Sequence, residues 1–167
     1  MIQSHQLTEL KQHLRKLLQE ELCLARFSET DEGDFLFHYE RMRVRVCFDP
    51  DESAYVWMGR VLYWARKPQP DELAAIDRCL NEVNHRYKAV KLSRSPRPDR
   101  EGDHAVSVSA SLLVEDIATT SAAALERYLG LIKAGTKLFW DLHRAATKDD
   151  APAGVRVDAA VVPVVRH

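Results

Sequence analysis

The sequence predicts an α+β fold in which an antiparallel β-sheet packs against α-helices, in the order α-β-β-β-β-α-β-β-α. Three observations lead to this prediction. Three segments repeat apolar residues at helical spacing, other segments have the composition or the alternation of strands, and the strands are grouped between the helices. The length of 167 residues suits a single domain, which we expect to span residues 1–148.

The first helix is expected over residues 4–24, because its leucines recur on one face while polar residues fill the other. These leucines are Leu7, Leu10, Leu14, Leu17, Leu18, Leu22 and Leu24. A short extended segment follows at residues 25–30. Residues 35–40 and 42–48 then alternate apolar and polar side chains, which is typical of antiparallel strands with one wet face.

The next strand, residues 55–65, is apolar on both faces and is interrupted by Gly59 and Arg60. A second helix begins near Asp71, and residues 87–93 are expected to form the strand after it. The strands are grouped between the helices, which favours an antiparallel sheet with the helices on one side of it.

A further strand, residues 106–112, alternates small or apolar residues with serines. Thr120 or Ser121 caps the last helix. Its buried stripe is predicted to comprise Leu125, Leu129, Ile132, Phe139 and Leu142. Residues 149–167 form a tail that contains Pro and Gly, and Pro163 confines its β-prone part to a sheet edge or excludes it from the sheet.

Composition excludes several classes of protein. The 24 basic and 25 acidic residues argue against a dedicated nucleic-acid binder. No apolar run reaches the roughly 18 residues of a membrane span, so we expect no membrane association. The three cysteines, Cys23, Cys47 and Cys79, are scattered and odd in number, which is typical of reduced, buried thiols in a cytoplasmic protein.

No catalytic or metal-binding motif is apparent. The seven histidines include no pair at metal-ligand spacing, and no cysteine lies near them in a zinc-finger pattern. The serines of residues 107–111 alternate as solvent-facing strand residues and lack the surroundings of a nucleophile. We therefore expect no enzymatic activity, no metal and no cofactor.

The aromatic residues are concentrated, with eight of thirteen between Phe35 and Trp64. Because one helical layer covers only one face of a sheet, the second face of residues 55–65 must meet another element, a second subunit or a client chain. Methionine, tryptophan and arginine are enriched at interfaces. The predicted partner-binding residues are Val56, Met58, Arg60, Leu62, Trp64, Arg43 and Arg45. The alternative is that the second helix covers this strip.

Charge is uneven along the chain. Residues 28–52 carry eight acids and three bases, whereas residues 86–100 carry one acid and six bases. The basic residues of the second segment, an alternative anion-binding site, are Arg86, Lys88, Lys91, Arg94, Arg97 and Arg100. A solvated strand and loop, or a surface that docks on an acidic protein, would account for the same pattern.

The order of elements and the segment 80–87, LNEVNHRY, resemble the YbjN family. Residues 34–37, 44–48 and 106–112 also fit, so the resemblance covers residues 7–146. Members of the family are described as proposed regulators of bacterial sensory transduction and share a fold with type III secretion chaperones. The resemblance implies no catalytic residue, and Asn81 and Asn84 could satisfy backbone groups at a helix end.

Two functions follow as hypotheses. The first is a non-enzymatic, chaperone-like or regulatory module, a homodimer that binds a client or partner segment on an exposed sheet face by strand addition or pocket capture. The second is a regulator that responds to a ligand or phosphate through residues 86–100.

Overall fold

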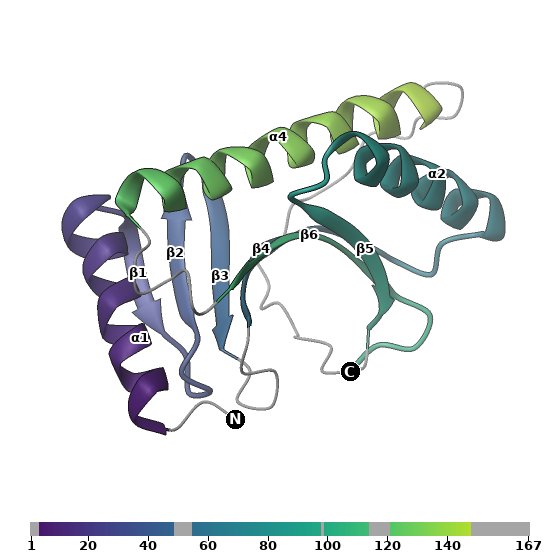
Figure 1. Cartoon of the computed structure of the whole chain (residues 1–167). Helices are drawn as coiled ribbons and strands as arrows, with labels where there is room; N and C mark the ends of the chain where they lie inside the picture. The colour runs from purple at the N-terminus through teal and green to yellow at the C-terminus, as the bar shows by residue number, and fades with distance from the viewer. Residues whose placement is uncertain (1–3, 49–54, 98, 114–120, 148–167) are drawn as a thin grey trace. The chain divides into compact units, whose positions relative to one another are not determined.

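The element order of the computed structural model confirms the prediction for the residues it describes, 4–48, 55–97, 99–113 and 121–147 (Figure 1). The helices are α1 (Ser4–Lys16), its continuation as the π-helix η1 (Leu17–Glu21), α2 (Pro70–Arg86) and α4 (Ala122–Thr147). The strands are β1 (Ala25–Glu29), β2 (Phe35–Tyr39), β3 (Met42–Phe48), β4 (Tyr55–Ala65), β5 (Lys91–Pro96) and β6 (His104–Leu113). They form a six-stranded antiparallel sheet in the order β1-β2-β3-β4-β6-β5, so the predicted α+β class is confirmed.

The chain divides into two compact units. The first unit comprises Met1–Arg60 and Ala110–Gly130, and the second comprises Val61–Ser109 and Leu131–His167. Strands β4 and β6 and helix α4 each contribute residues to both units. The predicted tail, residues 149–167, lies outside the described residues.

The core of the first unit lies between α1 and one face of β2, β3 and β4. Phe35 of β2 is opposite Val46 of β3, which is in turn opposite Met58 of β4, so these three side chains share a face. The Arg15 guanidinium of α1 lies 5.4 Å from the centroid of the Phe35 ring, which places α1 over that face. The buried side chains of this core include Leu10, Leu14, Phe35, Phe37, Val44, Val46, Phe48, Val56 and Met58.

In the second unit, α2 and the C-terminal part of α4 pack on one face of β5 and β6 (Figure 1). A Cβ atom at Gly135 of α4 would lie 3.2 Å from the Val90 side chain and 3.6 Å from that of Val108, so glycine permits the close approach of helix and sheet. Tyr63 of β4 contacts Phe139 of α4, with ring centroids 6.1 Å apart. These contacts define a helix-bearing side of the second unit.

The predicted N-cap of the last helix is confirmed at Ser121. The hydroxyl oxygen of Ser121 accepts a hydrogen bond from the backbone N–H of Ala124 at 3.3 Å, and α4 begins at the next residue, Ala122. Four members of the predicted stripe are completely buried, whereas Leu142 is half-buried.

The strand after α2 begins later than predicted. Residues 87–93 were expected to be extended, but β5 starts at Lys91. Helix α2 continues through Arg86, the N–H of Tyr87 still bonds to the carbonyl of Val83 at 2.8 Å, and a turn occupies the next two residues. The helical hydrogen bond therefore prevails over the β propensity of this segment.

The three cysteines are free thiols with different surroundings. Cys79 is buried on α2 and Cys47 is half-buried on β3, but Cys23 is exposed, so the expectation of a buried thiol is wrong for Cys23. Cys23 follows η1 with a positive φ of 51°, and its Sγ contacts the carbonyl of Glu20 at 3.4 Å. This turn directs the side chain away from the core.

Candidate functional site

The structure contradicts the expectation that Val56 and Met58 lie outside the helical core. Their side chains are 2% and 1% exposed. In the register of β3 and β4, Val56 is opposite Phe48 and Met58 is opposite Val46, so both point into the core beneath α1. Because β4 is apolar on both faces, its sequence does not show which face is buried. The pairing with β3 determines that face.

The same register corrects the position of Arg60, which we expected to share a face with Arg43 and Arg45. Arg45 is opposite Gly59, so the adjacent residue, Arg60, points to the other face of the strand. Arg60 is half-buried, and its burial lowers the pKa of its guanidinium. Arg43 is half-buried and shares the Arg45 face by alternation.

Arg45 is a buried structural residue. Its Nε donates to Oδ2 of Asp34 at 2.7 Å, and the two residues are 6% and 4% exposed. Asp34 Oδ1 accepts the backbone N–H of Phe48 at 3.1 Å, and Glu32 contacts Arg45 Nη2 at 3.1 Å. The pair joins the turn before β2 to the middle and the C-terminal end of β3, so Arg45 is not available to a partner.

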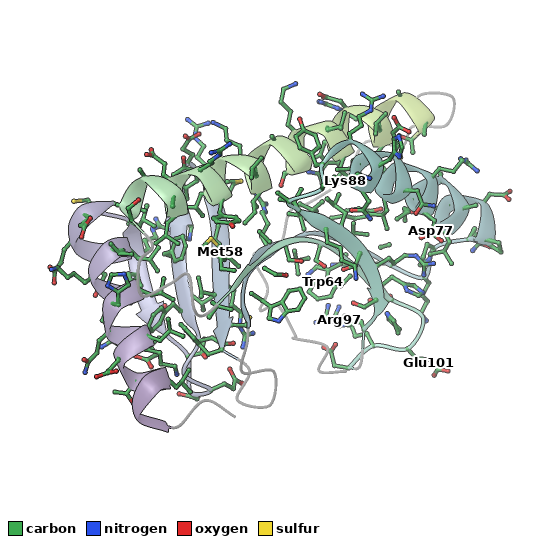
Figure 2. All side chains as sticks on the ribbon, in the orientation of Figure 1. Met58, Trp64, Asp77, Lys88, Arg97 and Glu101 are labelled. Carbon is green, nitrogen blue, oxygen red and sulfur yellow. The ribbon has the colours of Figure 1, made fainter. Side chains whose placement is uncertain are left out.

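Leu62 and Trp64 lie in the second unit on the side of β4 opposite Tyr63. Tyr63 faces α4, and successive residues of a strand point to opposite faces. Figure 2 shows Trp64 and Arg97 together on the side of the second unit away from α2, whereas Asp77 lies on the helix-bearing side. Leu62 is nonetheless only 1% exposed, and Trp64 is half-buried.

The Trp64 indole has an unusual environment. The Arg97 guanidinium lies 4.2 Å from the centroid of its ring, a cation–π contact. Its Nε1 atom is buried and has no hydrogen-bond partner within the part of the chain that the structure describes. A buried indole N–H usually has an acceptor, so this unsatisfied donor is unusual among the described residues.

Asp103 holds Arg97 and the end of β4 together. The carbonyl of Asp103 accepts the backbone N–H of Arg97 at 2.8 Å, and its carboxylate accepts the N–H of Lys67 at 3.1 Å. Asp103 is 6% exposed, and Gly102 before it has a φ of +82°, which favours glycine in this turn. The turn between β5 and β6 is thereby fixed against the strand that carries Trp64.

Serines of β5 and β6 extend the same surface. Leu92 and Val108 are opposite each other and face α4, so Ser93 and Ser107, also paired, face the other side. The hydroxyls of Ser93 and Ser107 are 3.1 Å apart. We call this surface of the second unit the Trp64 face; its members are Leu62, Trp64, Ser93, Ser95, Arg97, Ser107 and Ser109.

The six basic residues of segment 86–100 do not form one site. Arg94 donates to both oxygens of Asp77, at 2.9 and 2.8 Å, on the helix-bearing side, and this hydrogen bonding lowers the pKa of Asp77. Arg97 pairs with Asp99 at 2.5 Å on the opposite side, and Arg86 pairs with Glu82 at 2.6 Å. Lys88, Lys91 and Arg100 are exposed. Three of the six cations are thus matched by acids.

The outer edge of β5 is closed by Asn84 of α2. Its amide accepts the N–H of Leu92 at 2.7 Å and donates to the carbonyl of Leu92 at 2.9 Å, as a neighbouring strand would. The backbone groups of Leu92 therefore point away from β6. By alternation those of Pro96 point the same way, and Pro96 has no N–H to offer to a further strand. The sequence had indicated a backbone partner for Asn84 at a helix end, and the partner is this strand.

The other edge strand, β1, is irregular. Its register with β2 shifts between Ala25 and Ser28, and Arg26 has a positive φ of 55°. Bulges of this kind discourage the addition of a further strand. Both described edges of the sheet are therefore poorly suited to strand addition.

The described residues contain neither a cluster of metal ligands nor a helix that could span a membrane. No group of three or more His, Cys, Asp or Glu side chains is placed to hold a metal ion in the described ranges. Of the helices described, none has the length and apolar character needed to cross a bilayer.

Comparisons with known proteins concern the fold. No protein-family model matches the sequence, and no curated protein matches it significantly. Among solved structures, the chain is similar to YbjN from E. coli, which is described as a proposed transcription regulator. The two sequences are 14% identical, the TM-score is 0.57, and the alignment covers 82% of this chain and 92% of YbjN. An uncharacterized protein from Methanothermobacter thermautotrophicus aligns with 10% identity and a TM-score of 0.48, over 85% and 99% of the two chains. The expectation from the resemblance is confirmed at the level of structure: this chain has a YbjN-like fold.

Proposed function

We propose that this protein is a non-enzymatic regulatory module that binds a segment of a partner protein on the Trp64 face. The observation that carries the proposal is the Trp64 indole, stacked under Arg97 with a buried N–H that has no acceptor among the described residues. An unsatisfied buried donor costs about 1–3 kcal/mol. A ligand whose binding opens access to this buried atom and supplies an acceptor there would recover that free energy.

The chemistry of the face suits an extended peptide. A backbone carbonyl of the peptide would accept the Trp64 N–H, and an apolar side chain would pack on the half-buried indole ring. The serine hydroxyls offer further hydrogen bonds to peptide backbone. Tryptophan and arginine are the residue types that dominate binding energy at interfaces, and a cation–π contact contributes about 0.5–2 kcal/mol.

Capture on the face is favoured over strand addition, the other mode open at the outset. Strand addition needs unpaired backbone groups along an edge. Asn84 already pairs the edge of β5 at Leu92, and β1 is bulged. The partner segment is therefore expected to cross the face and to be recognised through side chains.

The regulatory part of the proposal is supported by the structural similarity to a protein described as a proposed transcription regulator. We also propose that the protein is a homodimer, that it acts in the cytoplasm and that it binds no cofactor. Multi-angle light scattering of the purified chain tests the dimer, and a monomer at all concentrations would contradict that part alone.

The anion-responsive alternative is less favoured, because acids already pair Arg86, Arg94 and Arg97. A thermal-shift screen with nucleotides and polyphosphate tests it directly. A Tm that increases with ligand concentration would favour this alternative over peptide binding.

The binding test uses two arginines of one turn. Arg97→Ala removes the guanidinium over Trp64, whereas Arg100→Ala removes the same charge from an exposed position. Wild type and both variants are applied to an array of short synthetic peptides, and urea unfolding confirms that each variant is folded. We expect Arg97→Ala to lose at least about tenfold in affinity, or 1.4 kcal/mol, for peptides that Arg100→Ala still binds. Equal loss in both variants would indicate a charge effect and would contradict the proposal.

A further inference from the structure

We infer that the partner segment is acidic and places one carboxylate beside Lys91 and another beside Arg97, an inference that rests on the proposed function. Lys91 borders the Trp64 face, because it is opposite Ser109 in the register of β5 and β6 and alternates with Ser93. The Lys91 side chain is exposed, and its ammonium group has no acidic partner among the described residues. This side of the second unit therefore carries a cation that no acid of the described chain neutralises.

The strands beneath this surface contribute no negative charge to it. The strand residues of the second unit whose side chains alternate to this side are Lys91, Ser93 and Ser95 of β5 and Ala105, Ser107 and Ser109 of β6. The carboxylate that pairs with Arg94 belongs to Asp77 of α2, which packs on the other side of the sheet. The surface is thus positively charged, although the whole chain has a formal net charge of -1.

The surface also offers hydrogen-bond donors that lack acceptors. The Nε1–H of Trp64 has no acceptor among the described residues. The hydroxyls of Ser93 and Ser107 are 3.1 Å apart, so one donates to the other and the second retains its hydrogen for an outside acceptor. The ammonium of Lys91 only donates, whereas a carboxylate only accepts. Carboxylates therefore complement this surface in hydrogen bonding as well as in charge.

Asp99 pairs with Arg97 in the free protein and is open to exchange. The Arg97 guanidinium donates to the two Asp99 oxygens at 2.5 and 2.8 Å, but the Asp99 side chain is 57% exposed. An exposed ion pair contributes little to stability, so a carboxylate of the partner can replace Asp99. Arg97 itself stays in place through its contact with Trp64 and its backbone bond to Asp103. A peptide also gains contact with the indole, which a free anion lacks.

The separation of the two cations sets the spacing of the carboxylates. Residues 91 and 97 are six positions apart, and six positions of extended chain span about 20 Å. An extended peptide has the same rise per residue, and its side chains at even intervals point to the same side. Two acidic residues about six positions apart would therefore reach Lys91 and Arg97 from one peptide.

The test measures this preference with matched peptides in the array. It includes synthetic peptides with two aspartates six positions apart, and each has a counterpart with asparagines. Lys91→Gln removes the charge beside the Trp64 face, and the control Arg78→Gln removes an exposed charge from α2 on the other side of the sheet. For wild type, we expect each aspartate that is replaced to weaken binding about threefold in fluorescence anisotropy. Lys91→Gln should lose about threefold for the aspartate peptides only, and Arg78→Gln should bind as wild type.

Reversal of the charge gives a second readout. Lys91→Glu should bind a peptide in which one aspartate is replaced by lysine more tightly than wild type does. Binding that requires Arg97 but is equal for aspartate and asparagine peptides would overturn the inference and retain the proposed function. Equal weakening by Lys91→Gln and Arg78→Gln would indicate an effect of net charge and would also overturn it. If no peptide distinguishes Arg97→Ala from Arg100→Ala, the proposed function itself fails.

Discussion

Replacing Asn84 with alanine removes both hydrogen bonds that close the edge of β5. The Asn84 amide accepts the N–H of Leu92 at 2.7 Å and donates to its carbonyl at 2.9 Å, and Leu92 is 2% exposed. In the variant, two backbone groups at a buried residue lose their partners. Water reaches them only if the edge opens.

The expected loss follows from these two bonds. An average hydrogen bond contributes about 0.5–1.5 kcal/mol, and an unsatisfied buried group costs about 1–3 kcal/mol. Alanine is a better helix former than asparagine by up to about 0.7 kcal/mol, which offsets part of the loss. We therefore expect Asn84→Ala to lower the free energy of unfolding by about 2 kcal/mol, which corresponds to about 4–8 °C in Tm for a chain of this size.

Urea unfolding measures this difference, and Asn81→Ala is the matched control. Asn81 lies on the same helix and is exposed, so its replacement should leave stability unchanged or slightly raised. Asn84→Ala should also associate at high concentration, because the edge of β5 becomes open to a second strand. If both variants unfold at the same urea concentration, the amide does not stabilise the edge and the reasoning fails.

Three further predictions concern residues that the structure places in new roles. Met58→Ala should cost about 2–5 kcal/mol in urea unfolding, since the side chain is 1% exposed; a loss below about 1 kcal/mol would mean that it lies outside the core. Iodoacetamide at pH 8 should label Cys23 and leave Cys47 unmodified in the folded protein, because burial and the neighbouring Asp34 raise the pKa of Cys47 to about 12; equal labelling by mass spectrometry would refute this. Hydrogen bonding to Arg94 lowers the pKa of Asp77, so its contribution to stability is present above the unfolded-state value of about 3.9 and is lost as the pH falls through the folded-state value. Asp77→Asn should therefore be less stable than wild type at neutral pH and lose less on acidification, and parallel pH profiles would contradict the assignment.

Local patterns in the sequence were sufficient to predict the order of helices and strands. Leucine spacing identifies α1, and alternation identifies β2, β3 and β6, because each pattern depends on residues a few positions apart. The cap at Ser121 is a short-range signal of the same kind. The start of β5 was misplaced because the last hydrogen bond of α2 extends the helix to Arg86.

The candidate site depended on long-range information that no local pattern contains. β4 is apolar on both faces, so only its pairing with β3 shows that Met58 is internal. The sequence placed Arg45 on a wet surface, whereas Asp34 pairs with it in the interior. Trp64 was named as a partner-binding residue, but the contact with Arg97 requires the turn that Asp103 fixes.

The most direct test of the central claim observes the indole N–H of Trp64 by NMR in the 15N-labelled protein. The chain has three tryptophans, so each indole signal can be assigned by substitution to phenylalanine. A peptide selected from the array is then titrated into wild type. We predict that the Trp64 indole proton shifts downfield and exchanges more slowly with water, as a newly formed hydrogen bond requires, while the signals of Trp57 and Trp140 change little. A bound peptide that shifts Trp57 or Trp140 and leaves Trp64 unchanged would contradict the account.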